Sequence, residues 1–389
     1  MFLIYYLIAI TFCIKNSFII DYLSNSITSI QRRYDMIEYD INTKTVTMKI
    51  FPRISLIMRV FVVFAGFIAI CAGTSYSPVP GNNSLYVEGE SRYIWMPDGE
   101  GVPHLVDLHE PVDEDYFNSR NGNDNQYWLF TRQNRNSRQI LQNGNANSVR
   151  NSNYRGNRPT KVIVHGWRNN GNTHMNPMIT EAFLAVTDCN VIVVDWNRLA
   201  SQGYNTAARG APDVGNHLGR FIQFLFNTAG GNWNDLHLVG FSLGAHIVGN
   251  AGRQIGGRAR RVTGLDPAGP TWGGNSRALN RNSGRYVEAI HTDGRILGIM
   301  DPIAHADFYP NGGRNPQPGC SASTCSHGRA TEFFAATVQR GHLVGRQCSN
   351  ISEAERSNCN GRQLHMGNAN LGKQGNGLYG LRTGASWPF

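Results

Sequence analysis

Leu236-His237-Leu238-Val239-Gly240-Phe241-Ser242-Leu243-Gly244 is a short apolar run followed at once by the pattern Gly-x-Ser-x-Gly. The run has the length and composition of a buried strand, and the pattern is typical of a sharp turn between a strand and a helix. A glycine two residues before the serine and another two after it permit a turn too tight for Cβ atoms. Such a turn projects the Ser242 hydroxyl above the end of the strand, where a nucleophile is placed.

Similar runs on both sides of this stretch predict the rest of a sheet. Lys161–Val164, Asn190–Val194 and Val287–Ile290 are β-branched or apolar and are bounded by turn residues. Asp213–Phe226 has apolar residues at helical spacing, with Pro212-Asp213 as a start signal. Alternating strands and helices predict a doubly wound, mostly parallel α/β sheet whose reactive groups gather at the carboxyl ends of the strands. Tyr127–Thr131 is predicted to be an edge strand.

A serine nucleophile needs a histidine to remove its proton and a carboxylate to orient that histidine. Asp266 ends the next candidate strand, Arg261–Leu265, and His327 is expected in a later loop. The order Ser, Asp, His is that of the α/β-hydrolase fold and differs from the orders in the two common serine-protease folds. Asp293 and Asp195 also end strands and compete with Asp266, although hydrogen bonding to loop backbone explains both.

Two backbone N–H groups are expected to stabilise the oxyanion that forms on the substrate. One belongs to Leu243, directly after the nucleophile, and the other to Trp167, in the loop after an earlier strand. An ordinary strand-ending turn with a buried tryptophan is the alternative for Trp167. His165, His246 and His305 are interpreted as structural histidines.

The composition indicates a globular protein, because 389 residues of which 41% are hydrophobic can bury a large core. The formal charge of +9 is spread along the chain without a basic run beyond Arg258–Arg261, which favours a solvated basic surface over a nucleic-acid site. After Gly73 the sequence contains 27 arginines and two lysines. Because arginine keeps its charge at alkaline pH, we hypothesise that the protein is active at alkaline pH or on anionic lipid surfaces.

The amino-terminal apolar stretches have the length of signal-peptide cores and are too short to span a bilayer comfortably. Residues 58–73 combine Met58-Arg59, an apolar core and the small residues of a cleavage site, and they predict a secreted protein rather than a membrane-anchored one. Residues 1–57 resemble no domain and are interpreted as an extension upstream of this signal. Residues 74–111 would then be the leader of the mature chain. Asn82 and Asn350 are glycosylation acceptors in a secreted protein.

Five cysteines follow the apolar leaders, so one must stay unpaired. Neighbours in sequence favour the disulfides Cys320 with Cys325 and Cys348 with Cys359, which fit an oxidising compartment. Cys189 is then a buried thiol, and other pairings stay open.

The chain from about Val112 to Phe389 resembles the catalytic domain of the pancreatic lipase family. The resemblance implies an α/β-hydrolase fold with Ser242 as nucleophile, Asp266 as acid, His327 as base, and Trp167 and Leu243 as oxyanion donors. It rests on Val164–Trp167, Val194–Trp196, Val239–His246, Gly264–Ala268, His291–Asp293 and His305–Gly313.

Three departures from that family refine the expectation. The lid between two cysteines before the catalytic histidine is reduced here to Ser321–Thr324, and the stretch Gly294–Ala304 is also short, which looks like venom phospholipases A1 and related insect neutral lipases. Short walls indicate an open, polar approach that suits phospholipids. Gly269, Asn280 and Ser283 stand where the family's calcium carboxylates are expected, so no metal is predicted. No carboxyl-terminal β-sandwich, and hence no colipase, is expected after Phe389.

The signal-peptide pattern and the resemblance together predict a secreted, monomeric serine ester hydrolase without a cofactor, acting on lipids at a membrane, micelle or droplet surface. Cleavage of the sn-1 ester of phospholipids is the favoured activity, and triacylglycerol or galactolipid cleavage is the near alternative. Lipase-like yolk proteins, which keep the fold as lipid-binding or storage proteins without the catalytic residues, are the alternative of another class.

Overall fold

The computed structural model describes residues 37–40, 45–48, 77, 79–118 and 124–389, and it divides the chain into two compact units, Met1–Ser75 and Tyr76–Phe389. In the first unit, β1 (Ile37–Asp40) pairs antiparallel with β2 (Thr45–Met48). The predicted signal peptide, 58–73, and the rest of the predicted extension lie outside the described residues. Within the described part, no helix combines the length and apolar character needed to span a membrane.

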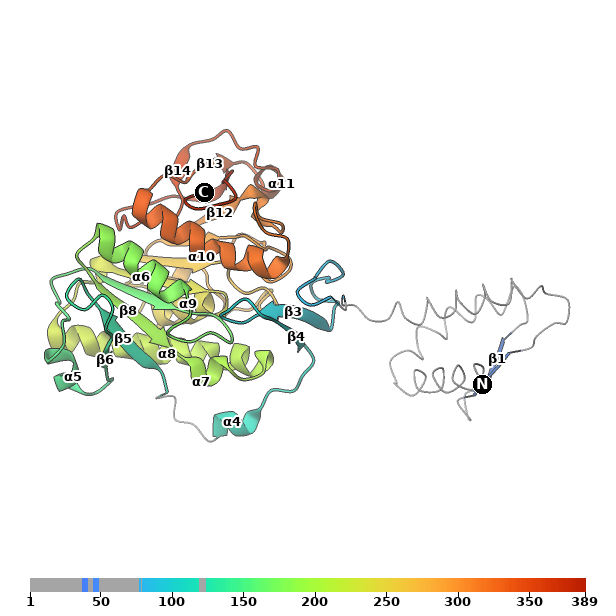
Figure 1. The fold of residues 1–389 in the computed structure, drawn as a ribbon, viewed down its shortest axis with the longest axis horizontal. Coiled ribbons are helices and arrows are strands. Elements are labelled where there is room, and N and C mark those ends of the chain that lie inside the picture. The colour runs from blue at the N-terminus through green and yellow to red at the C-terminus, as the bar shows by residue number, and fades with distance from the viewer. Residues whose placement is uncertain (1–36, 41–44, 49–76, 78, 119–123) are drawn as a thin grey trace. The chain divides into compact units, whose positions relative to one another are not determined.

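The second unit is built on an 11-stranded sheet (Figure 1). Its order is β14-β13-β15-β12-β11-β10-β9-β7-β8-β5-β6, and the strands from β15 to β8 run parallel to their neighbours. The strands are β5 (Gln126–Phe130), β6 (Gln139–Leu141), β7 (Thr160–Val164), β8 (Asn190–Asp195), β9 (Leu236–Phe241), β10 (Arg261–Leu265), β11 (Val287–Ile290), β12 (Ala306–Pro310), β13 (Val344–Cys348), β14 (Gln363–His365) and β15 (Gly377–Leu381). The predicted doubly wound, mostly parallel sheet is confirmed.

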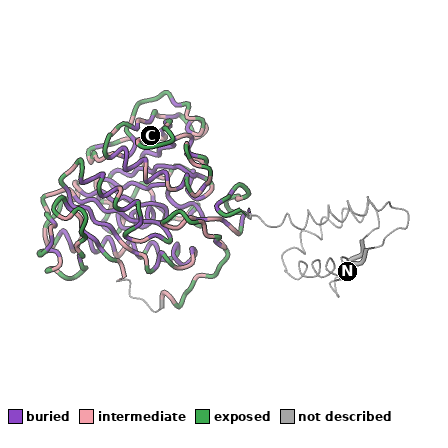
Figure 2. The backbone as a smooth tube through the Cα atoms, in the orientation of Figure 1, coloured by how far each residue is buried: buried purple, intermediate pink, exposed green. Residues whose placement is uncertain are grey.

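Helices cover both faces of this sheet. Val162 and Val164 of β7 point into a core shared with α8 and α9, whereas Ile163 between them points into a core shared with α6 and α10. Figure 1 shows α6 and α10 on the near face, and Figure 2 shows that much of the backbone in the interior of this unit is buried. The helices are α4 (Glu114–Asn118), α5 (Ala146–Arg150), α6 (Met175–Val186), α7 (Asn197–Ala200), α8 (Tyr204–Ala229), α9 (Leu243–Gln254), α10 (Ser323–Arg340) and α11 (Ile351–Glu355), with 3₁₀ turns η1 (Trp233–Asp235), η2 (Arg281–Ser283) and η3 (Asn311–Gly313).

Two expectations are wrong, namely the start of one helix and the position of one strand in the sheet. The helix expected to start at Pro212-Asp213 starts at Tyr204, so Pro212 lies inside α8. Proline in a helix interior removes a hydrogen bond and costs about 3 kcal/mol, but the preceding turns bury Ala207 and Ala211 completely, and that packing favours the longer helix. The strand predicted at the edge is β5, and β6 pairs with it on its outer side.

A separate two-stranded hairpin precedes the sheet. β3 (Tyr93–Pro97) pairs antiparallel with β4 (Pro103–Asp107) in a sheet of their own. The alternation of burial along β3 places Ile94 and Met96 in the core, together with Val106 of β4. The hairpin therefore packs on the body of the unit through one apolar face.

Candidate functional site

The serine turn has the strained geometry that its glycines predict. Ser242 lies between β9 and α9 with φ 56° and ψ −122°, outside the regions that L-residues usually adopt. A Cβ on Gly240 would lie 2.1 Å from the Gly244 carbonyl oxygen, and one on Gly244 would lie 2.3 Å from the Val164 carbonyl oxygen. Both positions therefore require glycine, and the turn holds Ser242 at the carboxyl end of β9.

Asp266 follows β10 and is completely buried. Its Oδ2 lies 2.6 Å from Nδ1 of His327, and its Oδ1 accepts hydrogen bonds from the backbone N–H groups of Thr292 (2.7 Å) and Asp293 (3.1 Å). The carboxylate is thus fixed in orientation on both oxygens. With Nδ1–H donated to Asp266, Nε2 of His327 is the ring nitrogen that can take up a proton.

The two competing carboxylates make different contacts. Asp293 accepts from the backbone N–H of Leu297 and from the Ser323 hydroxyl, and burial next to Asp266 raises the pKa of Asp293 well above its usual value. Asp195 faces His165 at 3.3 Å and accepts from the backbone N–H of Asn197. Among the described hydrogen bonds, His327 contacts Asp266 and neither competitor.

His327 lies on a helix, whereas the sequence placed it in a loop. α10 begins at Ser323, so His327 occupies its second turn and its ring packs 4.7 Å from that of Phe241. The helix continues into the buried alanines and phenylalanines of its later turns, and this burial offsets the roughly 1 kcal/mol that Gly328 costs a helix. His327 is therefore held by a packed element.

The loop after β7 runs directly beside the serine. A Cβ on Gly166 would lie 3.1 Å from Cβ of Ser242, so the backbone of His165–Trp167 approaches the turn closely. Leu243 is the first residue of α9, where backbone N–H groups lack partners within the helix. The backbones of Trp167 and Leu243 thus both lie next to Ser242. The histidines interpreted as structural are bonded into the body: His165 to Asp195, His246 to Ala268 and Leu279, and His305 to Val287.

The walls of the site extend beyond the two short loops that the sequence singles out. Ser242 is 8% exposed and His327 is 3% exposed. The cavity that they line measures about 20 Å³ and is walled by Trp167 and Leu297 and, from the end of β3, by Met96 and Pro97. The expectation of an open approach rests on two short loops alone. Residues 74–111 are interpreted there as a leader, so the wall that they supply is not predicted. The period-2 pattern of Ile94 and Met96 is the signal for it.

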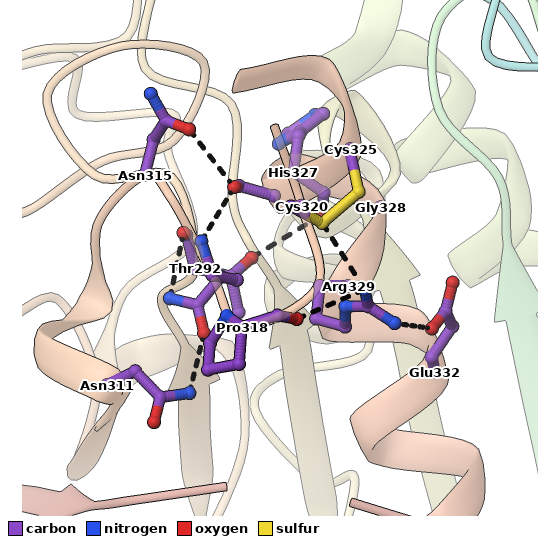
Figure 3. Close-up of a disulfide and its surroundings, with 12 residues drawn as sticks. Thr292, Asn311, Asn315, Pro318, Cys320, Cys325, His327, Gly328, Arg329 and Glu332 are labelled. Carbon is purple, nitrogen blue, oxygen red and sulfur yellow. Dashed lines mark hydrogen bonds and ion pairs between the residues drawn. A yellow bond between two sulfur atoms is a disulfide. The ribbon is translucent and has the colours of Figure 1, made fainter. Parts of the chain in front are cut away.

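The short loop before His327 is closed by a disulfide (Figure 3). Cys320 and Cys325 are bonded, as are Cys348 and Cys359, while Cys189 is free and buried. Arg329, two residues after His327, donates to the carbonyl oxygen of Pro318 (3.2 Å) and to Sγ of Cys320 (3.4 Å). The two disulfides expected between cysteines that are neighbours in sequence are therefore confirmed.

A guanidinium lies where the family resemblance implies calcium. Nη1 of Arg253 donates to the Ala278 carbonyl oxygen and to the Ser283 hydroxyl, both at 3.0 Å. Its Nη2 donates to the Arg277 carbonyl oxygen (2.9 Å) and to Asn250 (2.8 Å). The oxygens that could bind a metal already accept from a cation, and Gly269, Asn280 and Ser283 supply no carboxylate. Calcium therefore does not fit this loop, and the described residues hold no cluster of three His, Cys, Asp or Glu suited to a metal.

Comparison with known proteins shows which family this chain is similar to. A family model described as Lipase matches residues 103–389. Lipase member H-A of Xenopus laevis is 36% identical over 247 residues, which cover 60% of this chain and 53% of that protein. Pancreatic lipase-related protein 2 of Cavia porcellus is 31% identical over 260 residues, which cover 64% of this chain and 58% of that protein. Pancreatic triacylglycerol lipase of Sus scrofa is 34% identical over 242 residues, which cover 55% of this chain and 53% of that protein. The chain spans about half the length of the curated relatives it matches.

Among solved structures, a putative hydrolase of the α/β superfamily from Xanthomonas campestris pv. campestris has a TM-score of 0.28 and 17% identity, covering 36% of this chain and 74% of that one. A likeness of this degree carries no argument.

Proposed function

This chain belongs to the lipase family, and from that membership we propose that it is a carboxylic-ester hydrolase that cleaves acyl esters of lipids through a covalent acyl-enzyme. The observation that carries the proposal is the 2.6 Å contact between His327 and Asp266 in the pocket that also contains the strained Ser242 turn. A buried pair of this kind, whose histidine lines the same pocket as a serine at a strand end, is the arrangement that activates a serine hydroxyl.

In this mechanism Oγ of Ser242 attacks the ester carbonyl carbon while Nε2 of His327 takes the hydroxyl proton. Asp266 accepts from Nδ1–H and stabilises the imidazolium, and the backbone N–H groups of Leu243 and Trp167 donate to the oxyanion. The C–O bond to the alcohol breaks as His327 returns the proton to the leaving oxygen. Water, deprotonated by His327, then releases the fatty acid and restores Ser242.

Covalent labelling by a fluorophosphonate tests the mechanism. We expect the label on the peptide that contains Ser242, and we expect Ser242→Ala to remove both labelling and fatty-acid release without changing the unfolding temperature. Folded wild-type protein that takes up no label would instead support a lipid-binding or storage role like that of yolk proteins.

For the substrate, we propose the sn-1 ester of phospholipids, with triacylglycerols and galactolipids as the alternatives. The support is the short wall: only Ser321–Thr324 separate the bonded Cys320 and Cys325, and Gly294–Ala304 is short as well. Fatty-acid release from phosphatidylcholine, triolein and a monogalactosyl lipid should be fastest for phosphatidylcholine. Faster release from triolein would overturn this preference.

We also propose that the protein is secreted, as a monomer, after cleavage near Gly73. Two disulfides are typical of oxidising compartments, and Asn82 and Asn350 are both exposed, as glycan acceptors must be. Amino-terminal sequencing of protein from culture medium should begin near residue 74, and an N-glycosidase should lower its apparent mass. A mature chain that begins before Met58 would contradict the cleavage site.

A further inference from the structure

A groove lies beside α6, on the face of the sheet that this helix covers (Figure 1). β5 and β8 supply its apolar floor, where Trp128 and Val193 are register partners and Phe130 follows on β5. One wall is α6, and the other is the loop between β5 and β6. The groove has a volume of about 560 Å³, which is within the range of small-molecule sites. The described residues that line it differ from those that line the pocket of Ser242.

Two buried side-chain oxygens in the α6 wall lack a hydrogen-bond partner among the described residues. They are Oδ1 of Asn176 and Oγ1 of Thr180. Asn176 is 1% exposed and Thr180 is 4% exposed, and both line the groove. Nδ2 of Asn176 donates to the Asn170 carbonyl oxygen at 2.9 Å, which fixes the amide and leaves Oδ1 as the atom to be paired. An unpaired buried polar atom is costly, so two of them in one cavity wall indicate a ligand that supplies the missing partners.

The two oxygens belong to one face of the helix. Asn176 and Thr180 are four residues apart on α6, so their side chains lie one above the other. Glu181, the next residue, is exposed and also lines the groove. The α6 wall therefore presents oxygen atoms to whatever occupies the groove.

The opposite wall carries two arginines. Nη1 of Arg135 donates across the groove to Oε1 of Glu181 at 2.9 Å, so this guanidinium is paired with a carboxylate. Arg138 has different contacts: its Cζ lies 4.0 Å from the centre of the Trp128 ring, and its Nη1 donates to Oδ1 of Asn172 at 3.5 Å. A guanidinium has five N–H groups, and those of Arg138 that remain can donate to a ligand.

The two walls together select a ligand that is rich in hydroxyl groups. A hydroxyl donates to an acceptor such as Oδ1 of Asn176 and accepts from a guanidinium such as that of Arg138. An ionised carboxylate or phosphate cannot donate to Asn176, and an acyl chain would leave both Asn176 and Thr180 unpaired. A sugar ring has hydroxyls at its edge and a C–H face that fits the apolar floor on β5 and β8.

We propose that this groove is a binding site for a short saccharide. Sugar hydroxyls pair with Oδ1 of Asn176 and Oγ1 of Thr180, and Arg138 donates to oxygens at the opposite edge of the ring. The saccharide is either free in solution or the head group of a glycolipid, because both offer the same hydroxyls. Binding in this groove does not use Ser242, so the inference is independent of the proposed function.

Thr180→Val tests the site, because valine has nearly the shape of threonine and lacks the hydroxyl. Isothermal titration of the full chain with maltose, melibiose and mannobiose should show saturable binding of at least one of these disaccharides. Thr180→Val should weaken that binding about tenfold or more without lowering the unfolding temperature, because the hydroxyl has no partner to lose among the described residues. Fluorophosphonate labelling of Ser242 should stay unchanged in this variant.

Thr337→Val is the matched control. Thr337 is completely buried on α10, and its hydroxyl donates to the Met366 carbonyl oxygen at 2.8 Å. This substitution should lower the unfolding temperature and leave saccharide binding unchanged. Arg138→Met keeps an alkyl chain over the Trp128 ring but removes the guanidinium, and it should weaken binding about fivefold or more.

Vesicles that contain digalactosyl diacylglycerol separate the two sources of the sugar. Binding that is lost in Thr180→Val supports the site: binding of the disaccharide alone assigns it to free saccharides, binding of the vesicles alone to glycolipid head groups, and binding of both to either. Wild type that binds no sugar, soluble or lipid-borne, would overturn the proposal. Saccharide binding that Thr180→Val leaves unchanged would overturn it as well. Neither result bears on whether Ser242 reacts with a fluorophosphonate, which tests the proposed function separately.

Discussion

At the scale of single residues, two neighbouring carboxylates have different environments. Asp266 accepts three hydrogen bonds, including the one from His327. Asp293 is buried beside it, and both its burial and the charge of Asp266 raise the pKa of Asp293 well above its usual value. Asparagine keeps the shape of an aspartate but removes its negative charge, so the same substitution at the two positions shows which carboxylate supports His327.

We expect Asp266→Asn to lower the rate of fluorophosphonate labelling about 10³- to 10⁴-fold, because an amide cannot stabilise the imidazolium of His327. Asp293→Asn should lower it by less than about tenfold, since the described hydrogen bonds of the Asp293 carboxylate go to Leu297 and Ser323 and not to His327. Second-order labelling rates at pH 8 compare the two. The reverse order of effects would make Asp293 the acid that supports His327.

Lys161 places an ammonium group inside the sheet. It is completely buried on β7, 5.3 Å from the Phe183 ring, and burial lowers the pKa of Lys161 to about 8. The unfolded value is about 10.4, so charging this amine in the folded state costs about 3 kcal/mol below pH 8. Between pH 8 and 10.4 the unfolded chain binds a proton that the folded protein does not, and wild-type stability should rise with pH there.

Lys161→Met should therefore raise the free energy of unfolding at pH 7 by about 1–3 kcal/mol, and the gain should shrink as the pH approaches 10.4. Urea unfolding at pH 7, 9 and 10 measures both stabilities. A difference that is constant with pH would show that Lys161 is not the titrating group.

At the scale of elements, α9 joins the serine turn to the loop after Asp266. His246, Asn250 and Arg253 follow one another at helical spacing, and each bonds that loop: His246 at Ala268 and Leu279, Asn250 at Arg277, and Arg253 at Arg277 and Ala278. Burial lowers the pKa of His246 to about 3, so its ring is neutral and can accept at Nδ1 while Nε2–H donates. The polar side chains of α9 therefore hold the loop after Asp266 in place without a metal ion.

Arg253→Ala should accordingly lower stability by about 1–3 kcal/mol and speed amide hydrogen exchange in residues 269–283, with the labelling rate falling as the loop loosens. Arg253→Lys should recover part of the loss. Arg260→Ala is the control, because Arg260 is also half-buried but donates to the distant Leu371 carbonyl oxygen. Chelation should change none of these values in wild type, and a chelator-sensitive wild type would contradict the role of Arg253.

The elements that the sequence predicted are those whose environment is periodic. β7, β8, β9 and β11 are buried on both faces, so their apolar runs mark them directly. The hairpin was missed because β3 and β4 are short, mostly half-buried and interrupted by the turn at Asp98–Gly101, so their alternation is weak. α8 was started too late because Pro212 is a local stop signal, whereas its position inside the helix depends on packing that only the tertiary structure shows.

At the scale of the whole molecule, positive charge is carried on the surface by arginine. Both lysines after Gly73 are buried, and Lys373 forms an ion pair with Glu288 inside the sheet. Guanidinium groups keep their protons to above pH 12, so this surface stays positive where lysine surfaces are losing charge.

Binding to phosphatidylglycerol vesicles at low salt should therefore change less than about twofold in apparent Kd between pH 7 and 10.5. A variant that carries lysine at the exposed positions Arg209, Arg220 and Arg277 should bind equally at pH 7 and more weakly than wild type at pH 10.5. Loss of wild-type binding by pH 9 would show that the arginines do not govern it.

Some features of the site can be predicted from the sequence and others cannot. The positions of Ser242 and Asp266 follow from the strands that they end, and chain order singles out His327, although the helix that carries it is not predicted. The wall formed by Met96 and Pro97 does not, because it belongs to a hairpin more than 100 residues away from Ser242 in the sequence, and no local pattern indicates which surface the hairpin packs on.

The burial of Lys161 and Lys373 has a practical consequence for handling the protein. From Ser77 onward, amine-directed dyes, biotin esters and lysine crosslinkers find no exposed ε-amino group on the folded chain, and a lysine-specific protease finds no accessible cut site. Reaction at these two side chains would instead report unfolding, so the rate at which an amine reagent modifies them is a built-in measure of how often the sheet opens.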